Sequence, residues 1–212
     1  MTIEYKISDN FLSDSEFTEL TNCILPITTN MPKVVSNFGW NYICSQVTGD
    51  DEGNRFKTLT KIPLLNPVNN WYLSHSLQYQ SYYSEALQYF APLLGKLNPL
   101  AFYRIQANLT VQQDTRMRSL FHRDHGGKTD MLTSIYYMNT TNGPTLLEDG
   151  TEIECRANRL VTFPEETFHS GVMCTDSPYR IVVNFNYFKD MNAPERLGKP
   201  LLMHEMVRES LS

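Results

Sequence analysis

The sequence predicts an α+β fold that is mainly β. Two long segments, 101–111 and 179–188, alternate apolar and polar residues, as strands with one buried face do. Helical signals are fewer, and the clearest is the capping box Ser13-Asp14-Ser15-Glu16 ahead of an apolar stripe. With 212 residues, 41% of them hydrophobic and 19% charged, the chain suits one globular domain rather than a disordered protein.

The N-terminal half is expected to hold one strand, two helices and an irregular segment between the helices. Residues 3–7 predict a short strand, and the helix that starts at the capping box is expected to run to about Ile24. Residues 28–61 have no clean period but many aromatics, which indicates a β-hairpin or a long loop, either a peripheral sheet extension or a substrate lid. Residues 70–97 are rich in Leu, Gln, Tyr and Ala, and they predict a second helix that ends before Asn98-Pro99.

The C-terminal half is expected to form the sheets. In 101–111 the odd positions from 103 are apolar and predict a core face, while the even positions from 104 are polar. Residues 131–138 predict a further strand, 142–144 a turn, and Glu148-Asp149-Gly150 the turn of a hairpin. Near the end of the chain, 201–211 is expected to be helical and to pack on the domain or on a second copy, which would make a homodimer.

Four residues in the second half form a pattern that suits iron chemistry. His122 and Asp124 are two apart, so on a strand they project to one side, and His169 follows forty-five residues after Asp124. Two His and one carboxylate can hold Fe(II) and leave coordination positions open. Arg180 follows eleven residues later, and its planar fork matches a carboxylate, which is what a 2-oxo acid co-substrate needs. Zinc accepts the same ligands, but the H-E-x-x-H spacing is absent and a zinc hydrolase would leave Arg180 without a role.

This stretch resembles the catalytic core of the Fe(II)/2-oxoglutarate-dependent oxygenases, above all the prolyl-4-hydroxylase-like branch of bacterial and phage type. That family carries H-x-D, a distal His and then an Arg roughly ten residues on. Residues 134–139 with 143–145 resemble its "Y-L-N … G-G-x-T" segment, with Pro144 in place of the second Gly. Residues 157–164 resemble the strand that leads to the distal His. The resemblance covers about 100–188 well and the N-terminal half loosely.

The resemblance implies a double-stranded β-helix, or jelly-roll, with helices flanking its major sheet. It implies a single oxygenase domain over 1–212, with the catalytic core at about 100–188, N-terminal helices and a lid in 1–99, and a C-terminal extension at 189–212. His122, Asp124 and His169 would hold Fe(II), and Arg180 would bind 2-oxoglutarate. The further residues that we assign to the co-substrate site are Tyr136, Asn108, Thr145 and Asn184.

The activity implied by the resemblance is hydroxylation of an unactivated C–H bond, with O2 and 2-oxoglutarate consumed and succinate and CO2 released. The substrate would be a prolyl or other amino-acid side chain in a peptide or protein, and ascorbate binding belongs to the same expectation. Two alternatives stay open: a hydroxylase of a free amino acid or other small molecule, and a jelly-roll binding module without turnover.

Composition narrows the partners. The net charge of −5 argues against a broad nucleic-acid surface, and therefore against an oxygenase that repairs methylated bases. A local basic cluster (Arg116, Arg118, Arg123 and Lys128) is interpreted as solvated loop charge, or else as a guide for an anionic substrate. His125 is expected to point away from the iron ligands. Four cysteines without zinc spacing, no signal peptide and no membrane span predict a cytoplasmic protein with reduced thiols.

Overall fold

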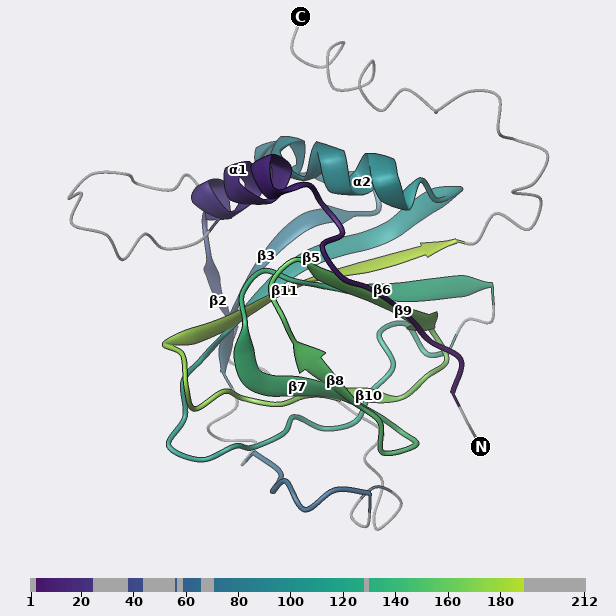
Figure 1. The fold of residues 1–212 in the computed structure, drawn as a ribbon. Helices are drawn as coiled ribbons and strands as arrows, with labels where there is room; N and C mark the ends of the chain where they lie inside the picture. The colour runs from purple at the N-terminus through teal and green to yellow at the C-terminus, as the bar shows by residue number, and fades with distance from the viewer. Residues whose placement is uncertain are drawn as a thin grey trace, which may run out of the picture.

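The computed structural model describes residues 3–24, 38–43, 56, 59–65, 71–127 and 130–188. Within these residues two antiparallel sheets face each other, and the helices lie on the outer side of the larger sheet (Figure 1). The larger sheet has eight strands and the smaller has three. The strands of the larger sheet, in spatial order, are β1 (Lys6–Ser8), β9 (Arg159–Pro164), β6 (Met131–Tyr137), β11 (Tyr179–Phe188), β5 (Ala101–Val111), β3 (Tyr72–Tyr79) and β2 (Asn41–Ile43), with β4 (Tyr82–Tyr83) paired to β3.

The smaller sheet closes the other side of the interior. Its strands, in spatial order, are β10 (His169–Gly171), β7 (Thr141–Leu147) and β8 (Glu152–Cys155). Two isolated bridges, Arg118 to Val172 and His122 to His169, add residues 118–122 beside β10 as a fourth segment of this layer. From β5 to β11 the chain passes back and forth between the two layers, which is the double-stranded β-helix that the sequence led us to expect.

The first helix, α1 (Asp14–Ile24), begins as predicted. The Ser13 backbone N–H donates to Glu16 Oε2 at 2.8 Å and the Glu16 N–H donates to Ser13 Oγ at 3.4 Å, so both halves of the capping box form. A second helical segment consists of the 3-10 helix η2 (Glu85–Phe90) and α2 (Ala91–Leu97), and it ends at Asn98 in the left-handed conformation (φ 39°).

The alternation predicted for the two long strands is confirmed along β11 and from Arg104 to Val111 of β5, but the register shift beside Asn186 places Phe102 rather than Tyr103 against the core beneath the helices. Ile105 and Ala107 of β5 and Ile181, Val183 and Phe185 of β11 are fully buried in one apolar core beneath the helices. The polar residues of the same strands therefore point inward, between the two sheets. A second apolar cluster fills the interior on the β6–β9 side, which leaves the β5–β11 side of the interior for polar groups.

Part of the second predicted helix is wrong. Residues 72–79 form β3, which pairs with the edge of β5, and helical structure begins only at Glu85. Leu73 and Leu77 are four apart and looked helical, yet both also suit a strand next to β5, and tertiary pairing decides between the two. A tight turn at Gln80 (φ 53°) then joins β3 to β4.

The turn predicted at 142–144 is also wrong, because these residues lie inside β7, where the register with β8 shifts between Thr141 and Thr145. A Cβ on Gly143 would run into the Val172 carbonyl oxygen, so only glycine allows this close approach. The first strand is Lys6–Ser8 rather than 3–7. The helix expected at 201–211, and most of 28–61, lie outside the described residues.

Two further expectations concern the cysteines and the membrane. Cys155 and Cys174 are buried free thiols, and Cys44 lies outside the described residues. In the part of the chain that is described, no helix combines the length and apolar character needed to cross a bilayer.

Candidate metal centre

His122 and His169 are held side by side by their own backbones. Each donates its N–H to the carbonyl of the other at 3.0 Å, so the segment 118–122 and β10 meet at these two residues. The imidazole ring centroids are 4.5 Å apart. Asp124, two residues after His122, turns back toward the same point.

The three side chains converge as metal ligands do. Asp124 Oδ1 lies 3.7 Å from His122 Nε2 and 3.9 Å from His169 Nε2, and the three ligand atoms all lie within 4.8 Å of one another. His169 and Asp124 have side chains 3% and 4% exposed, whereas His122 is 18% exposed and so lies toward the open side. Within the described residues this is the one group of three His, Cys, Asp or Glu side chains with such spacing.

Both imidazoles present the correct nitrogen. His122 Nδ1 lies 3.0 Å from the Leu120 carbonyl oxygen, and His169 Nδ1 lies 3.3 Å from that of Thr167, so each Nδ1 carries the proton. The Nε2 lone pairs then face the shared point, and His169 Nε2 is buried without a hydrogen-bond partner. Burial, and secondarily the neighbouring His122, lowers the pKa of His169 to about 4, which keeps this ring neutral and able to bind a metal near pH 7.

The Asp124 carboxylate is fixed by two neighbours. Asn186 Nδ2 donates to Asp124 Oδ2 at 2.8 Å and also lies 3.0 Å from Thr133 Oγ1, while Arg104 Nη2 lies 3.4 Å from Oδ1. Burial raises the pKa of Asp124, but Arg104, the two imidazoles and the Asn186 hydrogen bond outweigh it, so the net pKa is well below the usual value. The carboxylate is therefore ionised, with Oδ2 held and Oδ1 turned toward the imidazoles.

Arg180 lies in the same interior, deeper along β11. The residue is 5% exposed, its Nε donates to the Gly143 carbonyl at 2.7 Å, and its Nη2 donates to Thr145 Oγ1 at 3.0 Å. The Tyr137 ring lies 5.7 Å from the guanidinium carbon, and the Tyr137 hydroxyl donates to Thr145 Oγ1 at 2.8 Å. Among the described residues no carboxylate pairs with Arg180, and a buried charge without a counter-ion is costly. This guanidinium therefore suits an incoming anion.

One cavity of about 320 Å³ joins the triad to Arg180. Its walls include seven of the eight residues that the sequence assigned to the site: His122, Asp124, His169, Arg180, Asn108, Thr145 and Asn184. Asn184 Oδ1 is buried without a partner, so it too is available to a ligand. The residue set fits an Fe(II) ion at one end and a carboxylate at the other.

Tyr136 is the exception, and its assignment to the co-substrate site is wrong. Its side chain lies on the helix side of β6, where its hydroxyl donates to Asn158 Oδ1 at 2.7 Å and its ring packs edge-on against Phe11 and Phe17. The inward positions of β6 include Ile135 and Tyr137, so the tyrosine beside Arg180 is Tyr137, one residue further along the chain. Burial raises the pKa of Tyr137 to about 12, so its hydroxyl stays protonated beside Arg180.

Three polar residues near the triad were not predicted from the sequence: Arg104, Gln106 and Asn186. Arg104 and Gln106 lie on the polar face predicted for 101–111, and both line the cavity. Asn186 lies on the inward face of 179–188, six residues after Arg180. Their position on the correct face was the available signal, but nothing in the sequence alone showed which of these polar residues would reach the metal.

The neighbours of the triad do not add ligands. His125 lies beside Asn186, with Nε2 3.2 Å from Asn186 Oδ1, and its ring packs on Tyr103. The interpretation of the basic cluster as solvated charge fails for Arg118, which is 3% exposed and donates to the Ser119 carbonyl. Lys128 lies outside the described residues.

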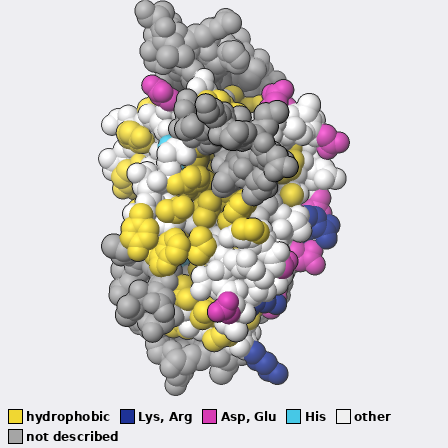
Figure 2. Space-filling view, turned by 90° about the vertical axis from the view of Figure 1, so that its left-hand side faces the viewer, with side chains coloured by type: hydrophobic (Ala, Val, Ile, Leu, Met, Phe, Trp, Pro, Cys, Tyr) yellow, Lys and Arg dark blue, Asp and Glu magenta, His cyan; other side chains and the backbone are white. Residues whose placement is uncertain are grey.

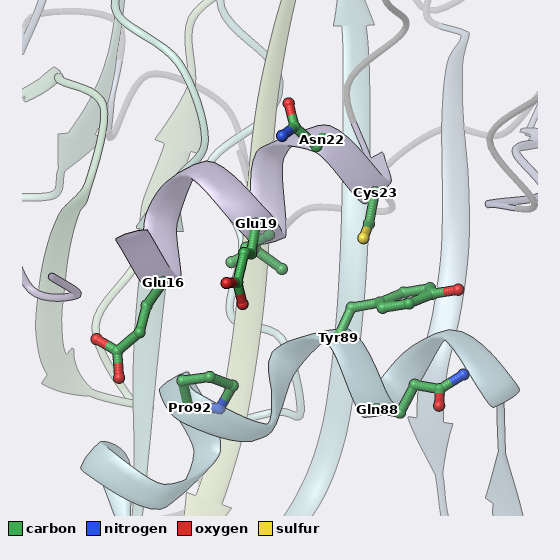
Figure 3. Close-up of a pocket in the computed structure, with 8 residues that line it drawn as sticks. Glu16, Glu19, Asn22, Cys23, Gln88, Tyr89 and Pro92 are labelled. Carbon is green, nitrogen blue, oxygen red and sulfur yellow. The ribbon is translucent and has the colours of Figure 1, made fainter. Parts of the chain in front are cut away.

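The molecular surface shows two other features. A groove of about 490 Å³ runs between α1 and the η2–α2 segment, lined by Glu16, Glu19, Cys23, Tyr89 and other side chains shown in Figure 3. On the side of the molecule that carries β2, apolar side chains gather at the surface (Figure 2). The groove contains no triad residue and does not include Arg180.

Comparison with known proteins identifies the fold. No protein-family model and no curated protein sequence matches the chain. A prolyl hydroxylase from Trichoplax adhaerens, solved with a hypoxia inducible factor peptide fragment, has a TM-score of 0.54 and 16% identity over 89% of this chain and 84% of that chain. The non-heme alpha ketoglutarate dependent carbocyclase SnoK has a TM-score of 0.56 and 14% identity over 88% and 80%.

A third solved structure contains bound ligands of its own. The epimerase SnoN in complex with Fe3+, alpha ketoglutarate and nogalamycin RO has a TM-score of 0.53 and 12% identity over 88% of this chain and 79% of that chain. At these identities the likeness establishes a shared fold, the double-stranded β-helix.

Proposed function

We propose that the chain is an Fe(II)- and 2-oxoglutarate-dependent oxygenase that hydroxylates an unactivated C–H bond and releases succinate and CO2. The observation that carries this proposal is the pairing, in one cavity, of the His122–Asp124–His169 triad with the buried guanidinium of Arg180, which no described carboxylate neutralises. The fold shared with SnoK, an alpha ketoglutarate dependent carbocyclase, and with SnoN, solved with alpha ketoglutarate bound, supports it.

In this proposal the triad holds the metal. Fe(II), when bound, supplies the activation of O2 that couples oxidation of 2-oxoglutarate to oxidation of the substrate. The protein contributes ligand geometry: the two Nδ1–H groups are held by backbone carbonyls and the Asp124 Oδ2 by Asn186, so the three remaining donor atoms stay directed to one point.

Arg180 binds the distal carboxylate of 2-oxoglutarate. Its Nε and Nη2 are held by Gly143 and Thr145, which fixes the plane of the guanidinium before the co-substrate arrives. Asn108 and Asn184, which line the same cavity, supply further polar contacts. A molecule with a metal-chelating group at one end and a carboxylate at the other matches the two ends of this cavity.

For the primary substrate we propose an amino-acid side chain in a peptide, such as a prolyl residue, as in the Trichoplax adhaerens complex. A free amino acid or other small molecule is the second candidate, supported by the likeness to SnoK and SnoN, two enzymes from nogalamycin biosynthesis. The peptide and small-molecule candidates are distinguished by measuring uncoupled 2-oxoglutarate turnover with candidate peptides and with free amino acids. Each measurement is made with and without ascorbate. A binding module without turnover has no use for a complete triad and Arg180.

The test is anaerobic titration with Fe(II) and 2-oxoglutarate, followed by succinate measurement in air. We expect a weak visible charge-transfer band in the wild type, and loss of succinate formation in His122→Ala and in Asp124→Ala, each checked for folding by circular dichroism. Asp130→Ala, which changes an exposed aspartate, is the matched control and should retain activity. Succinate production that survives in both triad variants would refute the proposed function.

A further inference from the structure

The charge of the cavity differs in sign from that of the whole chain. The chain has a formal net charge of −5, yet the cavity walls carry three arginines (Arg104, Arg123 and Arg180) against one carboxylate, that of Asp124. An excess of cations in a partly enclosed site attracts anions and raises their local concentration. Under the proposed function Arg180 is used by 2-oxoglutarate, and Arg123 lies over the Phe168 ring at 4.3 Å. Arg104 remains to be explained.

Arg104 lies on the inward face of β5, directly beside the triad. Its register partners are Asn186 on β11 and Tyr79 on β3. Its Nη2 lies 3.4 Å from Asp124 Oδ1, its Nε is buried without a hydrogen-bond partner, and its side chain is 19% exposed. The guanidinium is therefore only partly satisfied, at the more open end of the cavity, opposite the end that Arg180 occupies.

The ion pair with Asp124 does not use the full capacity of Arg104. Asp124 Oδ1 is also the oxygen that faces both imidazoles, so it is the atom that the proposed function gives to the metal. A divalent cation at that oxygen competes with Arg104 for the carboxylate and repels the guanidinium. Because 2-oxoglutarate brings two negative charges against the two positive charges of Fe(II), it leaves the excess of arginine charge unchanged.

We propose that Arg104 binds an anionic group, a carboxylate or a phosphate, on the primary substrate, and thereby selects acidic substrates. This inference rests on the proposed function and names the substrate class of the same site. The planar fork of Arg104 is suited to either oxyanion. The Tyr72 side chain, which lines the cavity, and Tyr79, which is 43% exposed beside Arg104, offer aromatic surface to the rest of such a substrate.

The experiment measures binding rather than turnover. Anaerobic protein loaded with Fe(II) and 2-oxoglutarate is titrated with two matched pairs, L-glutamate with L-glutamine and O-phospho-L-serine with L-serine, by calorimetry and by shift of the visible band. We expect at least one acidic member to bind tenfold or more tightly than its neutral partner. The pair that responds distinguishes a carboxylate from a phosphate.

Variants then assign the selectivity to one side chain. Arg104→Gln should reduce the preference for the acidic member at least fivefold while 2-oxoglutarate affinity changes less than threefold, and Arg104→Lys should keep part of the preference. Arg156→Gln, which changes a surface arginine paired with Glu154, is the control and should match the wild type.

Three results would overturn the inference: equal binding of acidic and neutral members, binding of none of the four, or a preference that survives in Arg104→Gln. A loss of Fe(II) affinity in that variant with the preference intact would show that Arg104 serves only to position Asp124. If the wild type forms no charge-transfer band, the proposed function fails instead. Calorimetry on the metal-free chain then decides separately whether Arg104 confers anion preference.

Discussion

Asn186→Ala tests whether the carboxylate ligand is held from behind. Asn186 is fully buried, and its Nδ2 donates to Asp124 Oδ2 at 2.8 Å, beside Thr133 Oγ1 at 3.0 Å. A hydrogen bond to a charged group contributes about 1.5–3 kcal/mol. Loss of an outer contact to a metal ligand typically weakens metal affinity by about 10–100-fold, which is about 1.4–2.7 kcal/mol. The two estimates agree, so we expect a 10–100-fold loss.

The assay is anaerobic titration of Fe(II) into protein with saturating 2-oxoglutarate, with Co(II) absorption as a second readout of ligand geometry. Asn186→Ala should fold, as judged by circular dichroism, and bind metal more weakly. Asn22→Ala, on the exposed side of α1, should bind as the wild type does. An unchanged metal affinity in Asn186→Ala would show that Asp124 is oriented without it and would refute the reasoning.

Three further predictions concern the surroundings of the site. Gly143→Ala should destabilise the fold by about 1–3 kcal/mol and weaken 2-oxoglutarate binding in a titration, because the added Cβ displaces the strand that holds Arg180. The control is Gly95→Ala, which has open space around its Cβ and should be neutral or stabilising in a thermal melt. Tyr136→Phe should lower the free energy of unfolding by about 1 kcal/mol and leave 2-oxoglutarate affinity within about twofold, and a larger loss of affinity would place this hydroxyl in the site after all. Asp9→Asn should destabilise the fold at pH 7, since the hydrogen bond from Arg159 holds the pKa of Asp9 below its usual value. The difference in free energy of unfolding between the variant and the wild type, measured with urea, should shrink as the pH falls through that pKa and wild-type Asp9 becomes protonated.

The elements that the sequence predicted well are those with one apolar face and one polar face. In β11 and in residues 104–111 of β5, core-facing apolar residues recur at every second position, so the pattern indicates both the strand and the direction of most side chains. At the start of β5 a register shift reverses the two faces, and Phe102 joins the helix-side core in place of Tyr103. The iron-binding pattern depends on the same property. Arg180 and Asn184 were assigned to one face because the apolar residues at every second position of β11 mark the opposite face, and both line the cavity.

Elements whose structure depends on a neighbour could not be predicted in this way. Strand β3 carries Leu73 and Leu77 at a helical spacing, and only its pairing with the exposed edge of β5 makes it a strand. In β7, Asn142-Gly143-Pro144 is turn chemistry, yet the glycine is needed because the Val172 segment passes too close for a side chain. In both cases the prediction used local sequence preferences, whereas contacts with distant segments of the chain determine the structure.

The error at Tyr136 has a different origin and a remedy. Almost every residue of β6 is buried, because one face packs on the helix-side core and the other on the core between the sheets. Its sequence therefore does not show which residues face which core. The face of each β6 residue can be inferred from its partner on β11, since residues directly opposite in an antiparallel pair share a face. Tyr137 lies opposite Val182, an inward position, and Tyr136 lies opposite Val183, which is in the helix-side core. A tyrosine in a strand buried on both faces can therefore be assigned to a site only after its register is known with a neighbouring strand whose two faces are distinguishable.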